Sequence, residues 1–96
     1  MRLEILRFWE QAQEDLETAR YNSAGRKFYA AAFFCQQAVE KALKALYMHQ
    51  TKEPPPSRYP NATDEIPARL YDEELVAEYL TKAQEVLEWV RKTLGL

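Results

Sequence analysis

The chain has 96 residues, of which 47% are hydrophobic, 12% aromatic and 29% charged, and its formal net charge is −2. This length and composition indicate one compact domain and exclude a disordered chain. The near balance of charges argues against a dedicated duplex-DNA binder, whose affinity depends on many cationic side chains. Two glycines are too few for an all-β fold, and the five prolines all lie between Pro54 and Pro67.

The N-terminal stretch lacks the continuous apolar core of a signal peptide, and no apolar run reaches the roughly 20 residues of a membrane helix. A lone cysteine, Cys35, cannot form an internal disulfide, which fits a reducing compartment. We therefore expect a cytoplasmic protein that does not enter a membrane.

Three segments have the periodicity of amphipathic helices, namely residues 3–22, 24–50 and about 72–94. Ser23 is a candidate N-cap for the second segment, and Asp72 for the third, which Gly95 ends. The apolar stripe of the second segment consists of Phe28, Ala32, Cys35, Val39, Leu43 and Leu46. These segments predict an all-α fold: an up-and-down antiparallel bundle of three long helices plus a Pro-rich connecting segment, in one domain over residues 1–96.

The second segment carries another line of residues on its opposite face, at spacings of four, three and four. Its members and their flanking lysine are Phe33, Gln37, Glu40, Lys41 and Lys44. One interpretation is a solvated face with a Glu40–Lys44 ion pair. The other is a surface that docks a partner chain or ligand, because Phe33 would otherwise be an exposed apolar group.

The Pro-rich segment contains Arg58-Tyr59-Pro60-Asn61. Arg58 offers a planar fork for phosphate or carboxylate, and Tyr59 offers a face for stacking. A turn in which Arg58 pairs with an acidic side chain is the simpler alternative. Arg58, Tyr59 and Asn61 are therefore candidate ligand-binding residues.

Signatures of catalysis and metal binding are missing. The glycines are too far apart for a phosphate-binding loop, and one Cys with one His cannot make a usual zinc site. Leu46 stands where a Glu-x-x-His motif ending at His49 would need a glutamate. We therefore predict no catalytic residue, no metal and no cofactor, with His49 partly exposed at a helix end and Cys35 packed in the core.

Residues 28–46, FYAAAFFCQQAVEKALKAL, resemble the second-helix signature of HEPN domains. Arg58-Tyr59-Pro60-Asn61 resembles the Arg-Tyr-Pro-Asp element of the same family. The flanking helices are similar to the first and closing helices of HEPN domains at Trp9, Ala12, Asp15, Leu16, Ala19, Tyr71, Ala77, Leu80, Ala83 and Val90. The resemblance covers nearly the whole chain.

This resemblance implies a helical bundle that dimerises. HEPN proteins are often encoded beside a minimal nucleotidyltransferase and act with it in toxin–antitoxin or defence pairs, and the family is associated with nucleotide binding. Family members also have a further helical segment before the Arg-Tyr-Pro element. A four- or five-helix bundle would follow if such a segment were missing near Glu53–Pro54.

Many HEPN proteins are metal-independent ribonucleases that use an Arg followed, after four to six residues, by His. Here the residues at those distances before His49 are Lys44, Leu43 and Ala42. Our first hypothesis is therefore a non-catalytic, dimeric partner of a nucleotidyltransferase that binds a nucleotide near Arg58. A ribonuclease toxin that uses His49 on RNA is the second hypothesis, and a stand-alone helical oligomerisation adaptor is the third.

Overall fold

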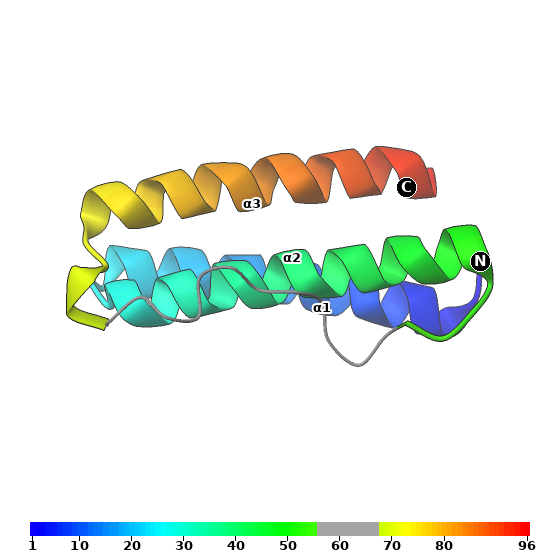
Figure 1. Cartoon of the computed structure of the whole chain (residues 1–96), viewed down its shortest axis with the longest axis horizontal. Coiled ribbons are helices and arrows are strands. Elements are labelled where there is room, and N and C mark those ends of the chain that lie inside the picture. Colours follow the sequence, from blue (N-terminus) through cyan, green and yellow to red (C-terminus); the bar gives the residue numbers. More distant parts are fainter. Residues whose placement is uncertain (56–67) are drawn as a thin grey trace.

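The computed structural model describes residues 1–55 and 68–96. Three long helices dominate it, α1 (Leu3–Ala24), α2 (Phe28–Thr51) and α3 (Glu73–Leu94), and the short 3-10 helix η1 (Ala68–Leu70) precedes α3 (Figure 1). The described residues contain no strand. The all-α helical bundle predicted from the sequence is confirmed.

The chain path departs from strict up-and-down alternation. α1 and α2 are antiparallel, but α3 runs in the same direction as α2, so that α1 is antiparallel to both (Figure 1). The rings of Tyr29, near the start of α2, and Tyr71, just before α3, lie 5.8 Å apart in an edge-to-face contact. A short loop would force α3 to reverse, whereas a long connection allows it to begin beside the start of α2.

The turn between α1 and α2 differs from the sequence expectation. α1 continues through Ser23 to Ala24, and Arg26 adopts a left-handed φ of 61°. The Lys27 amide then donates to the Asn22 carbonyl at 2.7 Å. Ser23 is therefore part of α1 rather than the N-cap of α2, which begins only at Phe28. At α3 the prediction is confirmed: the Asp72 side chain accepts from the Leu75 amide, and Gly95 ends the helix with a φ of 80°.

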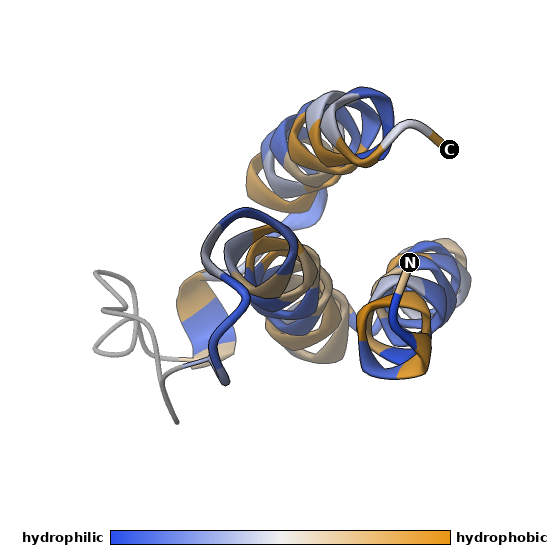
Figure 2. Ribbon diagram, turned by 90° about the vertical axis from the view of Figure 1, so that its right-hand side faces the viewer, coloured by the Kyte–Doolittle hydropathy of each residue, from blue (hydrophilic) through white to orange (hydrophobic). Residues whose placement is uncertain are grey.

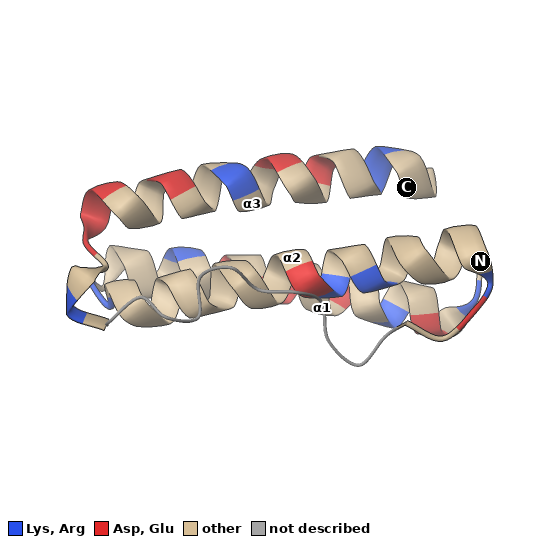
Figure 3. Cartoon of the chain, viewed as in Figure 1, with Lys and Arg blue, Asp and Glu red and all other residues tan. Residues whose placement is uncertain are grey.

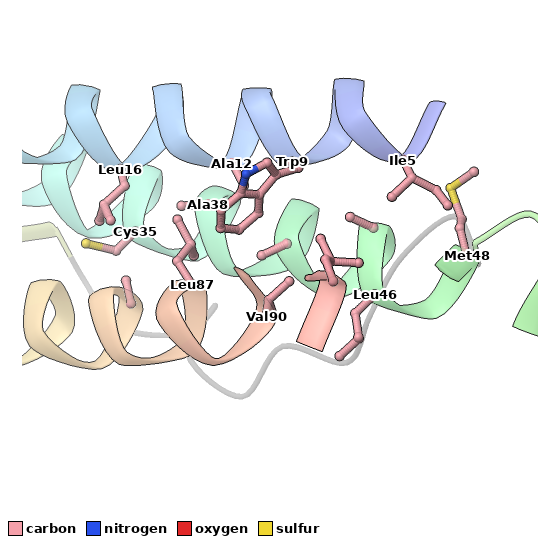
Figure 4. Close-up of a cluster of buried hydrophobic side chains, with 14 of the residues drawn as sticks. Ile5, Trp9, Ala12, Leu16, Cys35, Ala38, Leu46, Met48, Leu87 and Val90 are labelled. Carbon is pink, nitrogen blue, oxygen red and sulfur yellow. The ribbon is translucent and has the colours of Figure 1, made fainter. Parts of the chain in front are cut away.

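The core is built on small residues where α1 meets α2. Five alanines of this cluster have no exposed surface, Ala12, Ala19, Ala38, Ala42 and Ala45, and among the larger side chains of α1 and α2 there Met48 is also fully buried. Two residues of the predicted apolar stripe of α2, Val39 and Leu43, are only partly buried. This is because α2 packs against two helices and its alanines occupy the most buried positions. Trp9 of α1 points toward Leu87 and Val90 of α3, which close the core (Figure 4).

Hydrophobic positions of all three helices turn toward one another (Figure 2). A smaller cluster of Ala31, Ala32, Tyr71 and Val76 fixes the start of α3 on the start of α2. Within residues 1–55 and 68–96, no helix is long and apolar enough to cross a membrane.

Ala42→Leu should destabilise the protein by about 1–3 kcal/mol, because extra methylenes in a close-packed seam force the helices apart. The free energy of unfolding in urea measures this change. Ala77→Leu adds the same atoms at an exposed position of α3 and should change it by less than about 0.5 kcal/mol. Equal effects of the two substitutions would contradict the close packing of α1 on α2.

Candidate functional site

The predicted line on α2 divides into residues that hold the bundle together and residues that remain exposed. Lys41 Nζ lies 2.7 Å from Asp15 Oδ2 of α1 and donates to Gln37 Oε1 at 3.3 Å. Gln11 Nε2 donates to the other Asp15 oxygen at 2.9 Å. Asp15 is only 4% exposed, so both of its oxygens are satisfied within the protein. Gln37 and Lys41 therefore join α1 to α2, which favours a structural role for them.

Glu40 and Lys44 form the ion pair of the first interpretation, but their side chains are partly buried rather than fully solvated. Their side chains form an i,i+4 ion pair with 3.4 Å between Lys44 Nζ and Glu40 Oε1. Lys44 Nζ also lies 5.9 Å from the centre of the Phe8 ring, within range of a cation–π contact. Charged positions occur in the second half of α2, whereas its first half has none (Figure 3).

The charge-free half of α2 exposes two aromatic side chains one helical turn apart. Tyr29 is 56% exposed and Phe33 is 47% exposed. Among the described rings, Tyr29 makes an edge-to-face contact with Tyr71, and Phe33 makes one with Phe34, with 5.2 Å between the Phe33 and Phe34 ring centres. We call Tyr29 and Phe33 the aromatic edge. Tyr29 was not among the predicted site residues, although its spacing of four from Phe33 is a signal that the sequence contains.

The tyrosine next to the aromatic edge is held in a packed environment. Burial and the neighbouring Tyr79 raise the pKa of Tyr71 above its usual value, so its phenol stays neutral at physiological pH. The Tyr71 and Tyr79 ring centres lie 5.9 Å apart. The Tyr71 ring therefore packs between the rings of Tyr29 and Tyr79. Arg58, Tyr59 and Asn61, the other predicted binding residues, lie outside the described residues.

His49 lies in the last turn of α2 and is partly buried. It lines a cavity of about 550 Å³ at the end of the bundle, together with Met1, Arg2, Ile5 and Lys52. Helix packing thus brings an arginine and the histidine to one cavity although they are far apart in the sequence. Arg2 was not predicted as a site residue, because only the register of α1 against α2 places it there.

In the described part of the chain, Cys35 is not a reactive thiol and no metal-binding cluster is present. Burial raises the pKa of the Cys35 thiol to about 11, despite the nearby charge of Arg20, so the thiol is protonated at neutral pH. In residues 1–55 and 68–96, no group of three or more His, Cys, Asp or Glu side chains is placed to hold a metal ion.

Comparisons with known proteins agree with this architecture. The model of the HEPN domain family matches residues 5–56. A search of curated proteins finds no match. Among solved structures, the crystal structure of ST0689, an archaeal HEPN homologue, is similar with a TM-score of 0.76 and 31% sequence identity. That similarity covers 93% of this chain and 96% of the chain of ST0689.

Asp15→Asn should lower the free energy of unfolding by about 1–3 kcal/mol, because it keeps the shape of the side chain but leaves the Lys41 charge without its partner. Urea denaturation at neutral pH measures the loss. Glu78→Gln removes a carboxylate from an exposed position of α3 and should cost less than about 0.5 kcal/mol. If Asp15→Asn were as mild as this control, the pair would not hold α1 on α2.

Proposed function

The chain belongs to the HEPN domain family, and from this premise we propose that it is a non-catalytic, dimeric partner protein of a minimal nucleotidyltransferase. Such a pair would act in toxin–antitoxin or defence systems. The observation that carries the proposal is the aromatic edge, which exposes Tyr29 and Phe33 on the helix that holds the family signature.

Two features of α2 support docking of a protein at this edge. Its first half has no charged side chain, so an apolar partner surface can cover it without desolvating a charge. Exposed aromatic side chains are enriched in protein interfaces, where they bury a large area at little cost in side-chain entropy. Gln37, Glu40, Lys41 and Lys44 would then flank the docked partner as a polar border.

The nucleotide part of the proposal rests on Arg58, with Tyr59 and Asn61 beside it in the sequence. A guanidinium can form two parallel hydrogen bonds to a phosphate, and a phenol ring can stack on a base. The non-catalytic role rests on the absence of an arginine that precedes His49 with four to six residues between them.

The proposal expects a minimal nucleotidyltransferase to be encoded beside this gene, and Phe33→Ala should weaken binding to it by at least about tenfold, because the partner loses the ring that it buries. Isothermal titration calorimetry of the purified pair measures the affinity. Leu3→Ala truncates another exposed apolar side chain, at the opposite end of the bundle, and should leave the affinity unchanged. Wild-type protein that ignores the nucleotidyltransferase, or Phe33→Ala protein that binds it normally, would refute the proposal.

The cavity that contains both Arg2 and His49 favours a second candidate function, a metal-independent HEPN ribonuclease. In such chemistry an imidazole transfers protons to and from the RNA hydroxyl and leaving oxygen, while a guanidinium stabilises the negative charge that develops at phosphorus. Arg2 immediately precedes α1 and His49 lies in α2, so the two side chains do not form the sequence motif of the family.

Incubation of the purified protein with RNA separates the two candidates. The first proposal predicts no cleavage by the wild-type protein. Cleavage that falls by about 10²-fold or more in both His49→Ala and Arg2→Ala would select the ribonuclease instead, because general acid–base catalysis contributes that much. Arg69→Ala, in η1 near the other end of the bundle, is the control for a general loss of cationic charge.

A further inference from the structure

A groove of about 180 Å³ lies between α1 and α3. Its floor is buried and apolar, whereas most of its borders are exposed and polar. The floor consists of Trp9, Leu16 and Leu87, and the borders of Gln13, Glu17, Arg20, Gln84, Glu88 and Arg91. None of these residues belongs to α2 or to the aromatic edge.

The two borders of the groove carry the same short sequence. Residues 13–20 are QEDLETAR and residues 84–91 are QEVLEWVR, and both therefore read Gln-Glu-x-Leu-Glu-x-x-Arg. The Gln, Leu, second Glu and Arg of each unit line the groove, whereas the first Glu of each, Glu14 or Glu85, does not. The spacing explains this division, because residues four and seven positions after the Gln lie on one side of a helix.

The two units face each other with opposite chain directions, since α1 and α3 are antiparallel (Figure 1). An approximate two-fold axis across the groove therefore exchanges one unit with the other. Arg20 at the end of the first unit donates to Oε1 of Gln84 at the start of the second. The equivalent Arg91 instead pairs with Glu88 of its own helix, with 2.6 Å between Arg91 Nη2 and Glu88 Oε1.

We propose that this α1–α3 face is the surface through which a second copy of the chain binds, with the repeated units packed against each other in antiparallel directions. The proposal rests on the dimeric state proposed above and names its interface. A two-fold symmetric dimer needs a surface that complements itself, and a unit that already contacts its own repeat in antiparallel orientation has this property.

Charge favours a second copy over a different partner. The groove borders hold two glutamates and two arginines, so their formal charges cancel. A strongly acidic or basic partner would gain nothing from such a surface, but an identical one places arginine opposite glutamine or glutamate. Hydrogen bonding to Arg91 lowers the pKa of Glu88, so this carboxylate is ionised at neutral pH, and in the single chain it pairs with Arg91.

The outer face of α1 and α3 approaches the size of a stable interface. Two 22-residue helices side by side are about 33 Å long and roughly 20 Å wide. Their outer face thus offers on the order of 600–700 Å² per protomer, close to the roughly 800 Å² per partner of a stable interface.

Complementary charge reversal tests the interface by analytical ultracentrifugation. The first variant, Glu17→Arg/Glu88→Arg, makes every charged side chain of the borders an arginine, and the second, Arg20→Glu/Arg91→Glu, makes every one a glutamate. We expect a dimeric wild-type protein, at least about 100-fold weaker self-association of each variant alone, and recovery of a dimer when the two are mixed. Circular dichroism should show wild-type helicity for each monomer. If either fails to fold, Arg20→Gln/Arg91→Gln replaces them, with an expected loss of about tenfold.

The matched control is Glu14→Arg/Glu85→Arg, which makes the same charge change on the same two units but outside the groove. This control should remain dimeric, and mixing it with Arg20→Glu/Arg91→Glu should not recover the lost dimer. A dimer that survives both charge reversals would overturn the groove as the interface while leaving the dimeric state intact. A monomeric wild-type protein would contradict the proposed dimer itself. If the mixture of the two charge-reversal variants formed no dimer, the antiparallel pairing of the units would be overturned.

Discussion

The close approach of α1 and α2 is the constraint on which the rest of the structure depends. Side chains reduced to single methyl groups, such as Ala12 and Ala42, let the two backbones approach closely. At that separation Asp15 is 4% exposed, and its ionised form requires compensation inside the protein. Lys41 and Gln11 provide this compensation. A slip of one helix along the other would separate the charges, so the ion pair fixes the register that the alanines alone leave open.

An alanine seam also buries little apolar area, because methyl groups are small. The larger side chains of the core therefore lie where α3 covers the pair, with Trp9 from one side and Leu87 and Val90 from the other (Figure 4). α2 is thereby covered by two helices. Its charged second half is occupied by ion pairs, and its first half exposes Tyr29 and Phe33. The same packing that stabilises the bundle thus determines which part of α2 can accept a partner.

The apolar faces of the three helices could be predicted from the sequence because their periodicity is local. The start of α2 could not, since the left-handed Arg26 and the bond from Lys27 to Asn22 depend on the folded turn. The direction of α3 could not be predicted either, because a long connection between α2 and α3 permits either direction. The partner of Lys41 lies 26 residues away on another helix, so only the helix register reveals it. The repeat of residues 13–20 in 84–91 becomes informative once both units line one groove.

The two surfaces proposed for binding lie on different parts of the bundle and share no residue. The aromatic edge belongs to α2, whereas the groove is formed by α1 and α3 alone. Self-association through the groove would therefore leave Tyr29 and Phe33 exposed on both protomers. The two-fold axis of the dimer would relate the two aromatic edges. A nucleotidyltransferase bound at each edge would then give a complex with two copies of each protein. Contact through a shared surface would instead make self-association and partner binding compete, so the stoichiometry of the complex follows from where these two surfaces lie.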